Sequence, residues 1–152
     1  MTSSAAETIV GEARLESALW AGALREPPDW EPVFSTLAPE RFAEGLETVY
    51  EAYLVHYGRA RLFDVADGNE RVLLGDYLYA HGLVRIAAAG GVEAVAVMAD
   101  LISSCAALRA AGEPGDGEAW VEAARCLGGA PAEADVALAR ERHAARTLPP
   151  KL

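Results

Sequence analysis

Two acidic residues three positions apart, Asp64 and Asp67, are the first candidates for chemistry in this chain. If the segment around them were helical, both carboxylates would point to the same side and could hold Mg²⁺, which prefers oxygen ligands. The alternative is that they form a turn or a cap before the helix that follows at Asn69. The turn or cap is the interpretation that we prefer.

The chain has 3 histidines, His56, His81 and His143, and imidazole is the side chain that most readily transfers protons near neutral pH. His56 follows the apolar face of its predicted helix, which favours a structural place in the core or in an interface. Tyr77 and His81 are four residues apart and share a helix face, so they are predicted to form a structural pair. His143 lies in a charged segment and is expected to face solvent.

Asp76 is a single acid within a long apolar stretch. Burial of an unpaired carboxylate is costly, so a buried acid needs a hydrogen bond or a counter-charge. We therefore predict that Asp76 is a buried structural acid, and that an arginine, a tyrosine hydroxyl or a helix end is its partner.

The chain lacks the residues that several classes of function require. The chain has no Gly-x-Ser-x-Gly nucleophile elbow and no Gly-x-x-x-x-Gly-Lys phosphate loop. Its 2 cysteines, Cys105 and Cys126, lack the spacing of a zinc site. The net charge of −10 argues against nucleic acid and anionic membranes as partners, because both favour clusters of lysine and arginine.

The sequence also predicts where the protein works. Its first residues lack the basic and apolar regions of a signal peptide, and no apolar run is expected to reach the length of a membrane-spanning helix. We therefore expect a cytoplasmic protein without a transmembrane segment, in which both thiols stay reduced.

Helix signals in the first half position these residues. Ser4-Ala5-Ala6-Glu7 has the form of a capping box, and the helix that it starts is expected to end before Pro27-Pro28. Pro39 begins an amphipathic helix that is predicted to end near Gly58. Residues 59–67 are ambiguous and fit a short helical link.

The second half contains the longest predicted helix, which Asn69 caps and the Gly90-Gly91 pair ends. This helix is apolar on most sides and is therefore expected to be central. Further helices are predicted over residues 92–111, 118–127 and 131–146. The sequence thus predicts an all-α fold: a single-domain bundle of about six or seven helices over residues 1–148, with a frayed tail at 149–152.

Four motifs follow one another along the middle of the chain: Leu54-Val55-His56, Gly68-Asn69, the Leu-Gly-Asp-Tyr-Leu-Tyr-Ala segment at 74–80, and Gly90-Gly91. This order resembles that of the trans-polyprenyl diphosphate synthases. In that family Leu-Ile-His leads into the first aspartate-rich motif, and Gly-Asn opens the next helix, which contains a Gly-Asp step. The resemblance is best over 68–112 and implies that the chain has part of the isoprenoid synthase fold.

The chain departs from this family where the family's chemistry lies. Tyr57-Gly58 stands in place of two aspartates that hold Mg²⁺ against the allylic diphosphate, so His56, Tyr57 and Gly58 are a degenerate remnant of the motif. The second aspartate-rich motif belongs to a C-terminal half that the sequence does not include. The resemblance therefore implies a small subunit of a heteromeric prenyltransferase that is not catalytic alone. It would bind no cofactor itself, and Mg²⁺ would sit on a catalytic large subunit whose activity and product chain length it supports.

Dimers of this family pack largely through the Gly-Asp helix and the helix after it. The resemblance thus implies that an interface with the large subunit, or a shared core, is formed by Leu74, Tyr77, Leu78, His81, Met98 and Leu101. Two alternatives stay open: a helical binding or regulatory module unrelated to prenyl transfer, and an independent enzyme that uses Asp64, Asp67 and His56.

Overall fold

The computed structural model describes residues 4–147, which form six α-helices and no strand. The helices are α1 (Ser4–Glu16), α2 (Ala18–Gly22), α3 (Ala43–Tyr57), α4 (Gly68–Ala111), α5 (Asp116–Cys126) and α6 (Glu133–Arg146). Two 3₁₀ turns, η1 (Ser35–Leu37) and η2 (Glu40–Phe42), lie between α2 and α3. The all-α prediction is therefore confirmed. The predicted capping side chain of Ser4 and the predicted frayed tail at 149–152 lie outside the described residues.

Three local predictions are wrong. The first predicted helix is broken at Ser17, whose hydroxyl accepts a hydrogen bond from Trp20 N at 3.0 Å and caps α2. The link between α3 and α4 is irregular rather than helical. Asp67, and not Asn69, caps α4, because its carboxylate accepts hydrogen bonds from two backbone N–H groups of the first turn at 2.9 and 3.0 Å.

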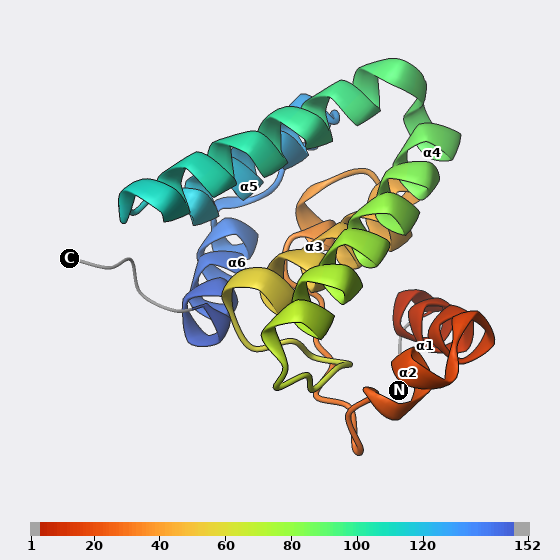
Figure 1. Ribbon diagram of the computed structural model, residues 1–152. Helices are drawn as coiled ribbons and strands as arrows, with labels where there is room; N and C mark the ends of the chain where they lie inside the picture. The colour runs from red at the N-terminus through yellow and green to blue at the C-terminus, as the bar shows by residue number, and fades with distance from the viewer. Residues whose placement is uncertain (1–3, 148–152) are drawn as a thin grey trace.

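The long helix α4 consists of two arms that meet at Gly91. This residue has φ 73° and ψ −161°, a backbone conformation that glycine reaches easily and L side chains rarely adopt. Figure 1 shows the resulting bend, after which the second arm passes over α5. The predicted helix break at Gly90-Gly91 is thus confirmed, although no loop separates the two arms.

Helix α3 is the centre of the fold (Figure 1). All of its residues from Gly45 to Val55 are buried, because α1, α4 and both 3₁₀ turns pack around it. A helix that is covered on every side must be apolar on most of its faces. The acids Glu47 and Glu51 break that pattern and require partners inside the core.

Two glycines allow α3 and the first arm of α4 to approach closely. A Cβ on Gly82 would lie 2.5 Å from Cγ2 of Val49, and a Cβ on Gly45 would lie 2.8 Å from Cδ1 of Ile86. Neighbouring atoms almost never come so close to a Cβ, so the missing side chains make room for the other helix. This close pair of helices is the frame on which the other elements are placed.

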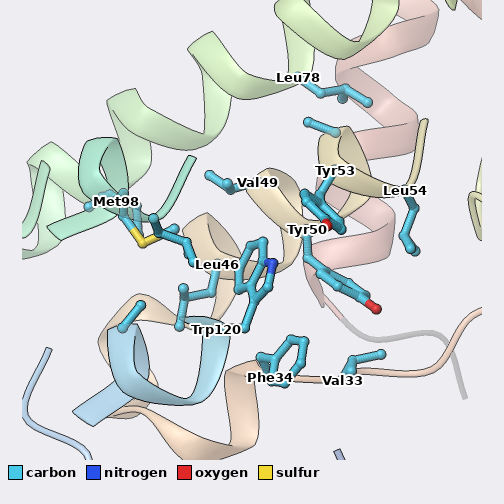
Figure 2. Close-up of a cluster of buried hydrophobic side chains, with 14 of the residues drawn as sticks. Val33, Phe34, Leu46, Val49, Tyr50, Tyr53, Leu54, Leu78, Met98 and Trp120 are labelled. Carbon is cyan, nitrogen blue, oxygen red and sulfur yellow. The ribbon is translucent and has the colours of Figure 1, made fainter. Parts of the chain in front are cut away.

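The indole of Trp120 fixes α5 against this frame (Figure 2). Its ring stacks on Phe34 with centroids 5.4 Å apart and 9° between the planes, and it meets Tyr50 edge-on at 5.1 Å. Such aromatic pairs add about 0.5–1.5 kcal/mol each beyond the effect of burying their area. The aromatic core therefore joins α5, α3 and the segment before η1.

Candidate functional site

Four of the six residues that were predicted for a subunit interface lie inside this chain's own core. Leu74, Leu78, Met98 and Leu101 are each between 0 and 4% exposed. Figure 2 shows Leu78 and Met98 within the cluster of buried side chains that also includes residues of α3. An apolar pattern tells which side of a helix is buried but not which chain buries it. These four side chains are covered here and offer no free surface to a partner.

The other two predicted interface residues, Tyr77 and His81, lie beneath the N-terminal helices. Their rings are 4.3 Å apart, and the ring of Trp20 in α2 lies 6.0 Å from that of Tyr77. The Nδ1 atom of His81 is 3.3 Å from a carboxylate oxygen of Glu12 in α1. The predicted pairing of Tyr77 with His81 is confirmed, and α1 and α2 cover much of both side chains.

The ring of His56, at the end of α3, packs directly against α4 at Gly75 and Asp76. A Cβ on Gly75 would lie 2.6 Å from Cε1 of the His56 ring, so only a glycine leaves room for the ring in this position. The same ring stacks on Tyr79 with centroids 5.3 Å apart and 20° between the planes. His56 is therefore packed between α3 and α4, which is the position that the preferred interpretation predicted. Burial lowers the pKa of His56, and the nearby carboxylate of Asp76 partly opposes that effect.

The prediction that Asp76 is a buried acid is wrong. Its side chain is 69% exposed, and its carboxylate lies 3.6 Å from Nε2 of His56 at the rim of the α3–α4 contact. Successive residues of a helix are about 100° apart, so Gly75 faces α3 while Asp76 turns toward solvent. An acid at the edge of an apolar helix face therefore needs no buried partner.

The Tyr57-Gly58 pair closes the end of α3 against α6. A Cβ on Gly58 would collide with the carbonyl oxygen of Arg146, and the same oxygen accepts a hydrogen bond from Arg59 N at 2.8 Å. The ring of Tyr57 packs on that of Tyr53 with centroids 4.9 Å apart. Tyr57 and Gly58 therefore both make packing contacts within this chain.

Asp64 and Asp67 do not form a carboxylate pair on one helix face, because the link that contains them is not helical. Asp67 caps α4, as the preferred interpretation predicted, while Asp64 has an exposed side chain and donates its backbone N–H to Ala23 O at 2.8 Å. Within residues 4–147, no three side chains of His, Cys, Asp or Glu lie close enough together to hold a metal ion.

A buried ion cluster around Arg61 was not foreseen from the sequence. The guanidinium is fully buried and donates to carboxylate oxygens of Glu47 at 2.5 Å and Glu51 at 2.9 Å, and to the carbonyl oxygen of Glu31 at 2.8 Å. It also lies 4.0 Å from the ring centre of Trp30. Burial alone would lower the pKa of Arg61, but the two carboxylates outweigh it and raise that pKa. This cluster ties the connector before η1 and the link after α3 to the middle of α3.

A second buried network joins α3, α4, α5 and α6 through Asp116. Its carboxylate accepts hydrogen bonds from Tyr53 Oη at 2.5 Å, Arg109 Nη2 at 2.8 Å and His143 Nε2 at 3.0 Å. The other ring nitrogen of His143 lies 2.8 Å from Tyr50 Oη, which can donate to it. The prediction that His143 faces solvent is wrong, since the residue is 5% exposed. Burial raises the pKa of Asp116, but these donors outweigh it, and the net effect is a pKa well below the usual range.

The sequence held a signal for the first network but none for the second. Glu47 and Glu51 are four residues apart on a helix that is otherwise apolar, and two acids on one buried face require a cation. Asp116 and His143 are 27 positions apart on different helices, so only the folded chain brings them together. The Arg61 cluster is buried, and the Asp116 network is largely buried, with the side chains of Arg109 and Asp116 12 and 15% exposed. Both networks join segments that are distant in the sequence.

A largely apolar surface of α4, interrupted by the exposed acids Asp76, Glu93 and Asp100, is left uncovered by residues 4–147. Its large residues are Val72, Leu73, Val84 and Val92, which are 53, 58, 70 and 82% exposed. Exposed alanines lie on the same helix at 80, 87, 88, 96 and 99. We call this surface the α4 outer face. Uncovered apolar areas of this kind commonly mark contact sites for other molecules.

The same helix bears on the expectation about membranes. Among the described residues, α4 alone is long and apolar enough to span a bilayer by length and composition, with a mean hydropathy of 1.6 in a window that is 22% buried. The prediction that no apolar run reaches the length of a membrane-spanning helix is therefore wrong for α4, by length and composition. The bend at Gly91 divides it into two arms of about 30 Å each.

No family model, curated protein or solved structure matches this chain. The two buried networks hold the fold together, His56 sits in a gap on α4, and the α4 outer face is free for contact. Of these features, only the last is an accessible surface of the size that another macromolecule would cover.

Proposed function

We propose that this chain is the non-catalytic small subunit of a heteromeric trans-prenyltransferase, and that it supports the activity and the product chain length of a catalytic large subunit. The observation that carries the proposal is the α4 outer face, because it lies on the helix with the Gly-Asp step and is largely apolar and left uncovered by residues 4–147. The assignment of these helices to part of the isoprenoid synthase fold belongs to the same proposal.

The contact between the quoted motifs supports this proposal. The Leu54-Val55-His56 end of α3 and the Gly75-Asp76 step of α4 are 19 or more residues apart in the sequence but touch through the His56 ring. A chance match of short motifs would not require that they meet. Their contact is what an inherited α3–α4 pair would retain after the acidic pair was lost.

The size of the α4 outer face agrees with a subunit contact. Two arms of about 30 Å length and about 10 Å diameter present on the order of 600 Å² to one side. A standard interface buries roughly 800 Å² on each partner, so modest contributions from neighbouring loops would complete it. In a contact of this kind the exposed valines would be buried and the alanines would let a partner helix approach closely.

The chemistry would then belong to the large subunit. In this proposal that subunit holds Mg²⁺ and the allylic diphosphate, and this chain binds no cofactor of its own. The complex works in the cytoplasm. The small subunit would act through packing, because its contacts determine the shape of the partner's helices beside the growing prenyl chain.

The experiment that tests the proposal is co-expression with a candidate large subunit, chosen because its gene lies next to this one and encodes two aspartate-rich motifs. The complex is captured through a tag on this chain, and prenyl transfer from isopentenyl diphosphate is measured with and without it. We expect co-purification and an activity that depends on both chains. A large subunit that is fully active alone and never co-purifies would contradict the proposal.

Substitutions on the α4 outer face make this test specific. Val84→Glu and Val92→Glu place a charge on the face without touching the core, so both should abolish co-purification while the isolated chain stays helical. Leu15→Glu is the matched control, since Leu15 is 90% exposed but lies on α1. An isolated chain that turned over substrate with Mg²⁺ would instead support an independent enzyme. Normal complex formation by both valine variants would place the interface elsewhere.

A further inference from the structure

The arginines of this chain are mostly neutralised by neighbouring acids, but a few are not. Within residues 4–147, eight arginines have a carboxylate oxygen within ion-pair distance: 14, 61, 85, 109, 125, 140, 142 and 146. Arg25, Arg41, Arg59 and Arg71 have no such partner among the described residues. Three of these four, Arg25, Arg59 and Arg71, line one and the same pocket.

This pocket has a volume of about 290 Å³ and lies where α3 ends and α4 begins. Its apolar walls come from Leu54 and Val55 at the end of α3 and from Phe63 and Val65 in the link. Small-molecule sites usually have volumes from about 300 Å³ upward, so this one suits a small ligand. It is separate from the α4 outer face.

The guanidinium groups of these arginines have hydrogen-bond donors that residues 4–147 do not use. Arg25 Nη2 donates to Phe63 O at 3.3 Å, and Arg71 Nη2 donates to Ala66 O at 3.2 Å. The Nε atom of Arg25 is buried and has no hydrogen-bond partner within the described part of the chain. A buried donor without a partner is costly, and three like charges around one space repel each other. An anion in the pocket would relieve the repulsion between these charges.

The charge of the lining indicates what kind of anion fits. Three arginines and the single acid Asp64 give the lining a net charge of +2, that is, three positive charges less one negative charge. Guanidinium groups bind phosphate oxygens through paired hydrogen bonds of fixed geometry. In a chain with a net charge of −10, such a local excess of positive charge is a specific feature of this pocket.

We infer that the pocket binds a small anion of the phosphate class, either free phosphate or diphosphate or the same group on a small molecule. The arginines supply charge and directed donors, and the apolar residues form part of the pocket wall. This inference rests on the pocket alone, and it can hold or fail whether or not the chain is a prenyltransferase subunit.

The test is isothermal titration of the full chain with inorganic phosphate and with inorganic diphosphate, at constant ionic strength set with chloride. We expect binding of at least one anion, and a loss of about tenfold or more in affinity for the double variant Arg59→Gln, Arg71→Gln. Both side chains are exposed, so this variant should fold normally. Arg41→Gln is the matched control, because Arg41 also lacks an ion pair but lies over the ring of Phe42, outside the pocket lining. Its affinity should equal that of the parent chain.

Two further measurements test the role of charge in the pocket and the source of the anion. Asp64→Asn removes the only acid of the lining and should tighten binding of the same anion. Vesicles of phosphatidylcholine with phosphatidic acid distinguish a lipid headgroup from a free ligand. The inference is overturned if neither inorganic anion binds, if only the vesicles bind, or if Arg41→Gln weakens binding as much as the double variant does.

Discussion

The imidazole ring of His56 occupies the space that a side chain at Gly75 would need, and a Cβ placed there would lie 2.6 Å from Cε1 of the ring. The glycine and the histidine are therefore one structural unit that joins the end of α3 to the first arm of α4. Asp76, one residue further along, reaches Nε2 of the same ring from the solvent side. In this structure the Gly-Asp step thus forms the contact surface for the His56 ring.

Gly75→Ala should displace the His56 ring toward solvent. The pKa of His56 is lowered by burial, so the displaced ring should titrate closer to its ordinary value of 6.5. NMR titration of the imidazole protons measures this change. Gly11→Ala is the control, since a Cβ there meets nothing within 4 Å and should leave the titration of His56 unchanged. An unaltered His56 pKa in Gly75→Ala would mean that α4 moves instead of the ring.

The lowered pKa of His56 also predicts how stability depends on pH. Between the folded pKa and 6.5, the unfolded chain binds more protons at this residue than the folded chain does. The contribution of neutral His56 is therefore fully present above pH 6.5 and is lost as the pH falls through this window. Urea unfolding of His56→Gln at several pH values should show a weaker fall in stability with acid than the parent chain. Parallel curves would contradict this prediction.

Arg61→Met should be strongly destabilising. The substitution keeps most of the side-chain volume but leaves the carboxylates of Glu47 and Glu51 buried without a cation. Breaking a buried ion cluster in this way costs about 3–5 kcal/mol, measured as the free energy of unfolding in urea. Arg140→Met is the matched control, because Arg140 also pairs with a glutamate, Glu118, but on the surface. Its unfolding midpoint should hardly change, since surface pairs contribute little.

Asp116→Asn should remove part of the acid sensitivity of the protein. The pKa of Asp116 is held below its ordinary value of 3.8 because hydrogen bonds from His143 and Tyr53 and the charge of Arg109 outweigh the effect of burial. The stabilisation by its carboxylate is present above pH 3.8 and disappears as the pH falls below it. The variant should lose on the order of 3 kcal/mol at pH 7 and show a flatter stability curve below pH 4. If the stability of the variant fell as steeply below pH 4 as that of the parent chain, other carboxylates would be the cause of the acid sensitivity.

The sequence predicted most of the helices, because their signals are local, but it did not show the break at Ser17. Glycine and proline mark the ends of α3 and α4, and the apolar period of α3 predicts its burial. The predictions from the sequence were wrong for residues whose surroundings come from distant segments of the chain. Asp76 lies in an apolar run but at its rim, and His143 lies in a charged helix but points at Tyr50 and Asp116.

The site was predicted only in part for a related reason. The pattern of α4 identified an apolar helix correctly, but Leu74 and Leu78 face α3 while Val84 and Val92 stay exposed. Which apolar residues face a partner depends on how much of the helix its own chain covers. The grouping of Arg25 with Arg59 and Arg71 likewise depends on the fold, since 34 positions separate the first two in the sequence.

The bend at Gly91 supports a last prediction, for the variant Gly91→Ala. Because φ at this position is 73° and ψ is −161°, a side chain there is strained, and the substitution should lower the free energy of unfolding by about 1–3 kcal/mol. Gly11→Ala tests the opposite case, since it replaces a glycine inside α1 with open space around it and should stabilise by roughly 0.5–1 kcal/mol. Urea unfolding measures both changes, and small-angle X-ray scattering shows whether the arms stay folded back. If Gly91→Ala were as stable as the parent chain and no more extended, the bend would not depend on the left-handed conformation of this glycine.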